Sequence, residues 1–80
     1  MTKSAVQTGG EAGVKYGKTS IGPFSYGDIA KVKTVTAPEA AQAAGYSGES
    51  AEDFSRGFHH GWRAALRSRG IRLSLLPAGT

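Results

Sequence analysis

Residues 50–68 have the periodicity of an amphipathic helix, and this stretch constrains the fold more than any other part of the chain. At about 100° per residue, its apolar side chains fall on one stripe, made up of Ala51, Phe54, Phe58, Trp62, Ala65 and Leu66. Such a stripe is typical of a helix face that is buried in a core. We therefore expect Phe58 and Trp62 to anchor the core rather than to stack on bases.

The opposite side of this helix is basic. It carries the side chains of Arg56, His60, Arg63 and Arg67, with His59 at its margin. A neutral solvated face would mix glutamate with arginine at spacings of three or four residues, and residues 54–68 contain no acid. These five side chains are our candidate partner-binding residues. The alternative is that they form a solvated face and bind nothing.

A strip of small residues, Gly57, Gly61, Ala64 and Ser68, separates the basic side from the apolar stripe. Glycine inside a helix costs about 0.5 to 1 kcal/mol relative to alanine, so glycines four residues apart indicate that another backbone packs closely there. We expect that partner to be an alanine-rich helix at residues 37–44.

Capping signals predict where these two helices begin and end. Thr36 and Glu39 have the spacing of a capping box, and Gly45 suits the left-handed position after a helix. Ser50 begins a second capping pattern with acids in the first turn, and Gly70 is the predicted terminator of the longer helix.

The remaining segments predict strands. Residues 14–26 are rich in valine, isoleucine and aromatics and are interrupted by glycine and proline, which is typical of short strands and turns. The alternation in 29–35 predicts another strand, with a helical turn capped by Asp28 as the alternative. Residues 71–75 alternate in the same way and predict a last short strand.

The predicted fold class is thus α+β. A small antiparallel sheet of two or three N-terminal strands and a short C-terminal strand is covered by the short alanine-rich helix and the longer amphipathic helix. Residues 1–13 are poor in apolar side chains and are expected to form a flexible N-terminal arm, and residues 14–80 to form a single small domain.

The composition argues against several classes of protein. The chain has no cysteine, which excludes disulfides and thiolate chemistry. No apolar run approaches the roughly 20 residues of a membrane span, and no cleavable leader is evident, so we expect a cytoplasmic protein that binds no membrane. Adjacent helical residues such as His59 and His60 point about 100° apart, so no metal site is expected. Catalytic motifs are absent from the sequence, and we expect neither an enzyme nor a cofactor.

Charge is distributed unevenly along the chain. Residues 1–53 carry five lysines and six acids, a net charge of −1, whereas residues 54–80 carry five arginines and no acid, a net charge of +5. This asymmetry indicates a polyanionic or acidic partner.

Residues 39–54 read EAAQAAGYSGESAEDF and resemble the first helix and turn of a helix-turn-helix module. In that family the second helix enters the major groove with its N-terminal residues on base edges. The matching positions include Glu49, Glu52 and Asp53, which would repel DNA, so sequence-specific readout is not expected. Contact with the phosphate backbone through Arg56, Arg63 and Arg67 remains open.

We therefore expect a small non-enzymatic protein that contacts nucleic-acid phosphates through the Arg/His face. The alternative is a protein–protein interaction module, such as an inhibitor or an accessory protein of a phage or other mobile element. That module would bind an acidic protein surface with the same face or through its sheet edge. Homo-oligomers could form through the sheet edge or a helix.

Overall fold

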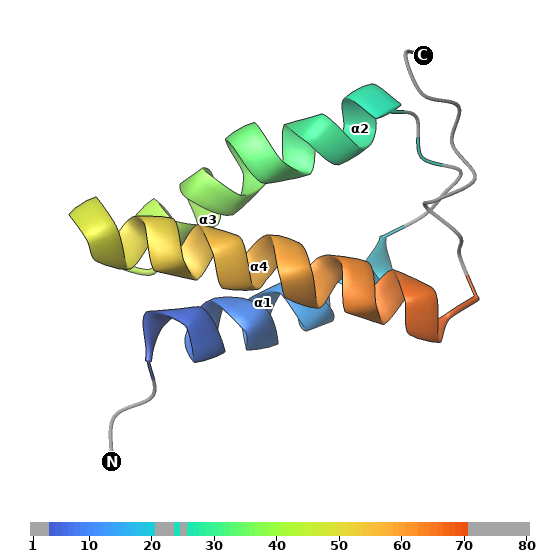
Figure 1. Ribbon diagram of the computed structural model, residues 1–80, viewed down its shortest axis with the longest axis horizontal. Helices are drawn as coiled ribbons and strands as arrows, with labels where there is room; N and C mark the ends of the chain where they lie inside the picture. The colour runs from blue at the N-terminus through green and yellow to red at the C-terminus, as the bar shows by residue number, and fades with distance from the viewer. Residues whose placement is uncertain (1–3, 21–23, 25, 71–80) are drawn as a thin grey trace.

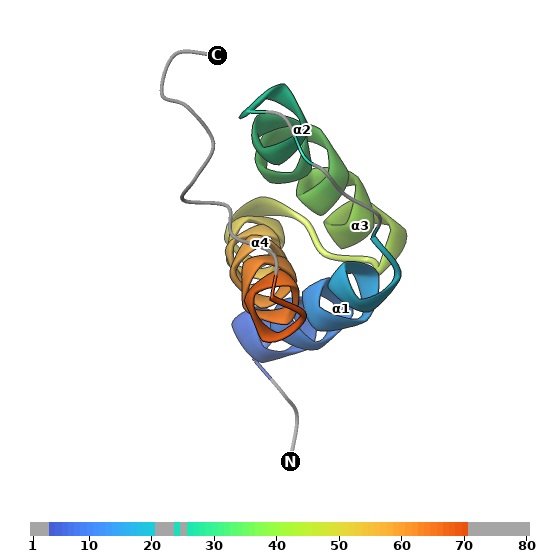
Figure 2. The same cartoon turned by 90° about the vertical axis from the view of Figure 1, so that its right-hand side faces the viewer.

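The computed structural model describes residues 4–20, 24 and 26–70, which are helical apart from short connections (Figure 1). The elements are α1 (Ala5–Thr19), α2 (Tyr26–Lys31), the π-helical turn η1 (Val32–Thr36), α3 (Ala37–Ala43) and α4 (Gly48–Ser68). The elements α2, η1 and α3 follow one another without a break. Helices α1 and α4 lie side by side and run in the same direction, and the α2–η1–α3 segment runs back along α4 (Figures 1 and 2).

The predicted antiparallel sheet is wrong, because the part of the chain that the structure describes contains no strand. Residues 14–19 belong to α1, and residues 29–35 belong to α2 and η1. The strand predicted at residues 71–75 lies outside the described residues. Strand propensity is decided largely by packing context, and here the valine and tyrosine of residues 14–19 lie on a helix that packs against α4. Residues 5–13, expected to belong to an arm, form the first part of the same helix.

Glycines at every fourth position of α1 bring this helix against the backbone of α4. Gly9, Gly13 and Gly17 are buried. A Cβ atom on Gly9 would collide with the carbonyl oxygen of Phe54, and one on Gly13 would collide with that of Phe58. Since the second α-hydrogen of glycine points where a Cβ would lie, these carbonyls accept weak Cα–H···O contacts, which recur at close helix pairs.

Helix α4 contributes glycines to the same interface. A Cβ atom on Gly57 would collide with the carbonyl oxygen of Val6, and one on Gly61 would collide with that of Gly10. The prediction that these glycines admit another backbone is confirmed. The partner is α1 rather than the alanine-rich helix, because only α1 has glycines in matching register.

The apolar stripe of α4 forms the core as predicted. Its buried members are Phe54, Phe58, Trp62, Ala65 and Leu66, and the η1–α3 segment adds Val32, Ala37 and Ala41. With α1 on its glycine side and the η1–α3 segment on its aromatic side, α4 exposes one remaining face to solvent.

A π turn precedes Pro38 in the middle helical segment. Proline has no N–H and its ring crowds the carbonyl four residues earlier, so the regular hydrogen-bond pattern cannot continue through it. The N–H of Ala37 donates to the carbonyl of Val32, five residues back. The capping box predicted at Thr36 is not formed: Thr36 has helical dihedral angles and makes no side-chain cap bond, because the helix already began at Tyr26.

The predicted ends of the helices agree better with the structure. Gly45 follows α3 with a φ of 91° and Gly70 follows α4 with a φ of 83°, both in the left-handed region that favours glycine. The start of α4 differs slightly from the prediction, since the helix begins at Gly48 rather than after Ser50.

Arg69 closes the C-terminal end of α1. Its Nη1 donates to the carbonyl oxygens of Gly17 and Ser20, each at 2.6 Å. Those carbonyls lie at the negative end of the α1 dipole, where a cation is favourable. Beside them, Nε1 of Trp62 donates to Oγ of Ser20 at 3.1 Å. Arg69 is therefore a structural residue that joins the ends of α1 and α4.

We expect Arg69→Ala to lower the free energy of unfolding by about 1 to 2 kcal/mol, because two charge-assisted hydrogen bonds are lost at a partly exposed site. Urea titration followed by circular dichroism measures the change. Arg67→Ala is the matched control, since Arg67 is exposed, and we expect it to change stability by less than about 0.5 kcal/mol. Equal effects of the two substitutions would contradict the capping role.

Candidate functional site

The solvent-exposed face of α4 carries four of the five predicted residues in a row. Arg56, His60, Arg63 and Arg67 are all exposed, and their spacing places them along one side of the helix. At 1.5 Å per residue the row is about 16 Å long. The packing of α1 and the η1–α3 segment on the other faces of α4 leaves this basic face open.

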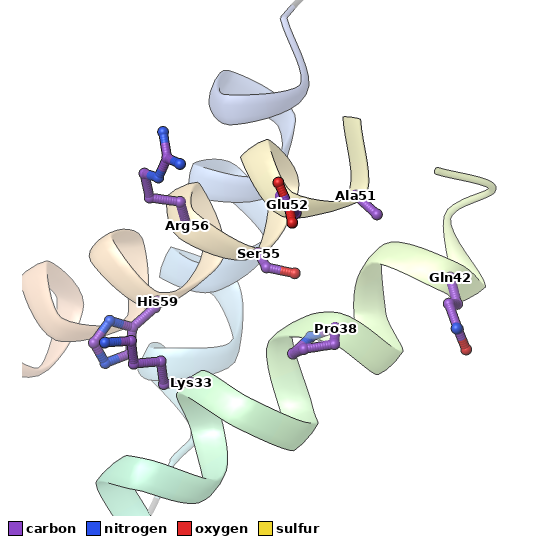
Figure 3. Close-up of a pocket in the computed structure, with 8 residues that line it drawn as sticks. All are labelled: Lys33, Pro38, Gln42, Ala51, Glu52, Ser55, Arg56 and His59. Carbon is purple, nitrogen blue, oxygen red and sulfur yellow. The ribbon is translucent and has the colours of Figure 1, made fainter. Parts of the chain in front are cut away.

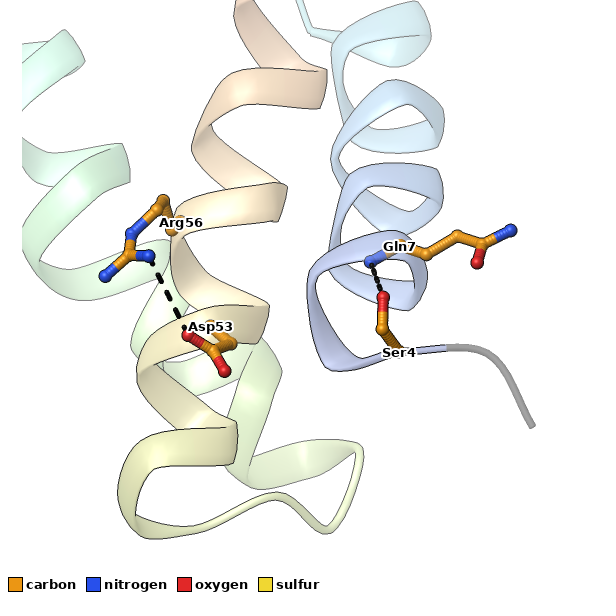
Figure 4. A network of polar contacts seen from close by, with 4 residues as sticks. All are labelled: Ser4, Gln7, Asp53 and Arg56. Carbon is orange, nitrogen blue, oxygen red and sulfur yellow. Dashed lines mark hydrogen bonds and ion pairs between the residues drawn. The ribbon is translucent and has the colours of Figure 1, made fainter.

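Asp53, one turn before Arg56, pairs with this end of the row. Nη1 of Arg56 lies 3.8 Å from Oδ1 of Asp53; the Arg56 side chain is exposed and the Asp53 side chain is about half exposed (Figure 4). An exposed pair of this kind is worth about 0 to 1 kcal/mol, so it leaves Arg56 free to exchange Asp53 for another anion. Figure 4 also shows the cap of α1, in which the N–H of Gln7 donates to Oγ of Ser4 at 3.1 Å.

His59 differs from the other predicted residues because it is half-buried. Its ring stacks on Trp62 with centroids 6.2 Å apart and an interplanar angle of 27°. Its Nε2 is buried and has no hydrogen-bond partner among the described residues. Burial lowers the pKa of His59 below its ordinary value, and the positive charges of Arg63, Lys33 and His60 lower this pKa further. His59 is therefore a neutral imidazole at neutral pH.

Lys33 joins the basic face from another element. It lies on the π turn η1, and Figure 3 shows its side chain beside that of His59. The sequence did not indicate this residue, because the alternation in residues 29–35 predicts a strand rather than a turn that packs on α4. The only available signal was Pro38, which predicts an irregularity in the preceding helical turn.

Two hollows meet at His59. A smaller one of about 230 Å³ lies over α4 and brings together His59, His60, Arg63 and Arg67. A larger groove of about 380 Å³ lies between the η1–α3 segment and α4. The five predicted residues are thus divided between two hollows, since Arg56 lines the larger groove and only His59 lines both.

The larger groove has a basic end and an uncharged end (Figure 3). Lys33 and His59 lie together at one end, and Gln42 and Ala51 lie at the other; Arg56 is on the α4 side of the first end, with its guanidinium group pointing away from α3. Pro38 and Ser55 lie between them, and Glu52 lies on the α4 wall. An anion would therefore be held at the first end, and a neutral group would fit further along.

The lowered pKa of His59 has a consequence for stability. The unfolded chain takes up a proton on this histidine near pH 6.5, whereas the folded chain takes it up only at lower pH. The free energy of unfolding should therefore fall as the pH falls from about 6.5 towards the folded pKa. Urea titrations between about pH 7.5 and 5.5 measure this fall. His59→Gln should reduce this fall in stability. A His60→Gln variant, which keeps His59, should show the same fall as the wild type. An unchanged fall in His59→Gln would contradict this assignment.

Neither a metal site nor a membrane-spanning helix is found in the described ranges. No group of three or more histidine or acidic side chains could hold a metal ion there. None of the described helices is both long enough and apolar enough to cross a bilayer. The sequence matches no protein-family model, and neither a curated protein nor a solved structure resembles it significantly.

Proposed function

We propose that this protein is a small non-enzymatic nucleic-acid-binding protein that contacts backbone phosphates through the exposed face of α4. The contacting groups are Arg56, His60, Arg63 and Arg67, together with Lys33 from η1. Arginine suits this role because its planar guanidinium group can bind a phosphate through two hydrogen bonds.

One observation carries the proposal: Arg56, His60, Arg63 and Arg67 form an exposed row about 16 Å long on α4, and no acid occurs in residues 54–68. A helix that needed only to be solvated would gain from glutamates three or four residues from its arginines. Over this length one strand of a B-form duplex rises past about five phosphates, so several of them lie within reach of the row.

Charge reversal tests the proposal. We expect Arg56→Glu combined with Arg63→Glu to weaken binding to a labelled oligonucleotide at least about tenfold, because two phosphate contacts are replaced by repulsion. Fluorescence anisotropy at low salt measures the affinity, and circular dichroism confirms that the variant is folded.

The matched control reverses two lysines on α1. Lys15→Glu combined with Lys18→Glu changes the net charge by the same amount, and both lysines are exposed. We expect a loss of no more than about threefold, because these lysines lie outside the α4 face and act only through long-range attraction. Equal losses in the two variants would contradict a defined binding face, and an acidic protein partner would then be the remaining candidate.

A further inference from the structure

We infer that the groove between α3 and α4 receives an unpaired base of the strand whose phosphates lie on the basic face, so that the protein prefers single-stranded nucleic acid to duplex. This inference rests on the proposed function and names its substrate class.

The groove and the basic face are continuous. Arg56 belongs to the row along α4 and also lines the groove, His59 lines both hollows, and Lys33 lies beside His59 at the basic end (Figure 3). A phosphate bound by Lys33 and Arg56 would place its attached nucleoside at the mouth of the groove. The volume of about 380 Å³ leaves room for a base there.

The walls suit a base better than a second phosphate. Pro38 and Ala51 offer aliphatic surface, whereas the carboxylate of Glu52 would repel an anion. Glutamate, glutamine and serine side chains all form hydrogen bonds with base edges. The phosphate therefore stays at the basic end, and the base lies towards Ser55 and Gln42.

His59 gives independent support. Its ring is fixed against Trp62 on one side, and histidine rings are among the groups on which unpaired bases stack. The His59 side chain also lines the groove, so a base held there would lie against it. Paired bases in a duplex cannot enter the groove, because they are stacked and their pairing edges are occupied.

Three labelled probes of equal length test the inference by fluorescence anisotropy: a single-stranded oligonucleotide, the same strand built from abasic residues, and the duplex. The abasic strand keeps every phosphate and removes every base. We expect the single strand to bind at least about fivefold more tightly than the abasic strand, which corresponds to one inserted base. Equal affinity for these two strands would overturn the inference and leave the phosphate contacts standing. Failure of all three probes to bind would overturn the proposed function as well.

Two variants test whether the base lies in this groove. Ser55→Leu fills the middle of the groove without changing the charge. We expect this variant to bind the single strand only as tightly as it binds the abasic strand. Its affinity for the abasic strand should equal that of the wild type. Gln42→Leu changes an exposed side chain, so the fold should tolerate it. We expect this variant to weaken single-strand binding about twofold to tenfold. If both variants fold and bind all three probes like the wild type, the base lies elsewhere and the inference is wrong. A polyglutamate of equal charge should displace the labelled single strand less efficiently than the unlabelled strand does. Equal displacement by the two competitors would also overturn the inference.

Discussion

Gly13→Ala is expected to lower the free energy of unfolding by about 3 kcal/mol or more, the upper end of what overpacking costs. The added Cβ would collide with the carbonyl oxygen of Phe58 and lie 2.7 Å from its carbonyl carbon. Both are backbone atoms of α4, so no side-chain rotation relieves the contact, and the two helices must separate. A chain of this length has a total stability of only about 4 to 12 kcal/mol.

Gly10→Ala is the matched control for this prediction. Gly10 is also inside α1, but the nearest atom to an added Cβ is the carbonyl oxygen of Gly57 at 3.7 Å, an ordinary contact. Because alanine favours a helix over glycine by about 0.5 to 1 kcal/mol, this variant should be as stable as the wild type or slightly more stable. Urea titrations of both variants measure the difference. Similar stabilities for Gly13→Ala and Gly10→Ala would contradict the backbone contact between α1 and α4.

Trp62→Ala is expected to cost about 3 to 5 kcal/mol, the usual range when a fully buried aromatic side chain is removed. Trp62 has no exposed surface, and it contacts Phe24 at a centroid distance of 5.4 Å and His59 at 6.2 Å. Its loss would leave a cavity between α1, α4 and the middle segment, and would remove the surface against which His59 is held.

The variant Trp62→Phe separates packing from the hydrogen bond to Ser20. Phenylalanine keeps an aromatic ring but lacks Nε1, so we expect a smaller loss of about 1 to 2 kcal/mol. Thermal and urea unfolding measure both changes. A Trp62→Ala loss no larger than that of Trp62→Phe would contradict the place of Trp62 at the centre of the core.

The long helix α4 could be predicted from sequence because its signals are local. Its aromatic residues repeat at helical spacing, and Gly70 marks its end. The same periodicity identified the basic residues as one face, since faces of a helix follow from the sequence once the helix is known.

Helix α1 was missed because its composition is that of a loop or strand. Threonine, glycine and valine are poor helix formers, and the helix depends on tertiary contact with α4. A useful signal was nonetheless present: Gly9, Gly13 and Gly17 recur every four residues, as do Gly57 and Gly61. Two matching glycine series in one chain predict that two helices pack backbone to backbone.

Two features of the candidate site required the structure. Lys33 reaches the basic face only because a π turn forms before Pro38 and the middle segment packs on α4. The burial of His59 follows from its position between Trp62 and the groove, whereas the sequence placed it only at the margin of the face.

The salt dependence of nucleic-acid binding tests the central claim most directly. If Lys33, Arg56, Arg63 and Arg67 each neutralise one phosphate of a single strand, the logarithm of the association constant should fall against the logarithm of salt concentration with a slope of about −3. Anisotropy titrations between about 50 and 200 mM salt determine this slope. We predict a slope of about −3 for the wild type and a clearly shallower one for the Arg56→Glu and Arg63→Glu double variant. A wild-type slope shallower than about −1, or equal slopes for the two proteins, would contradict phosphate binding by the α4 face.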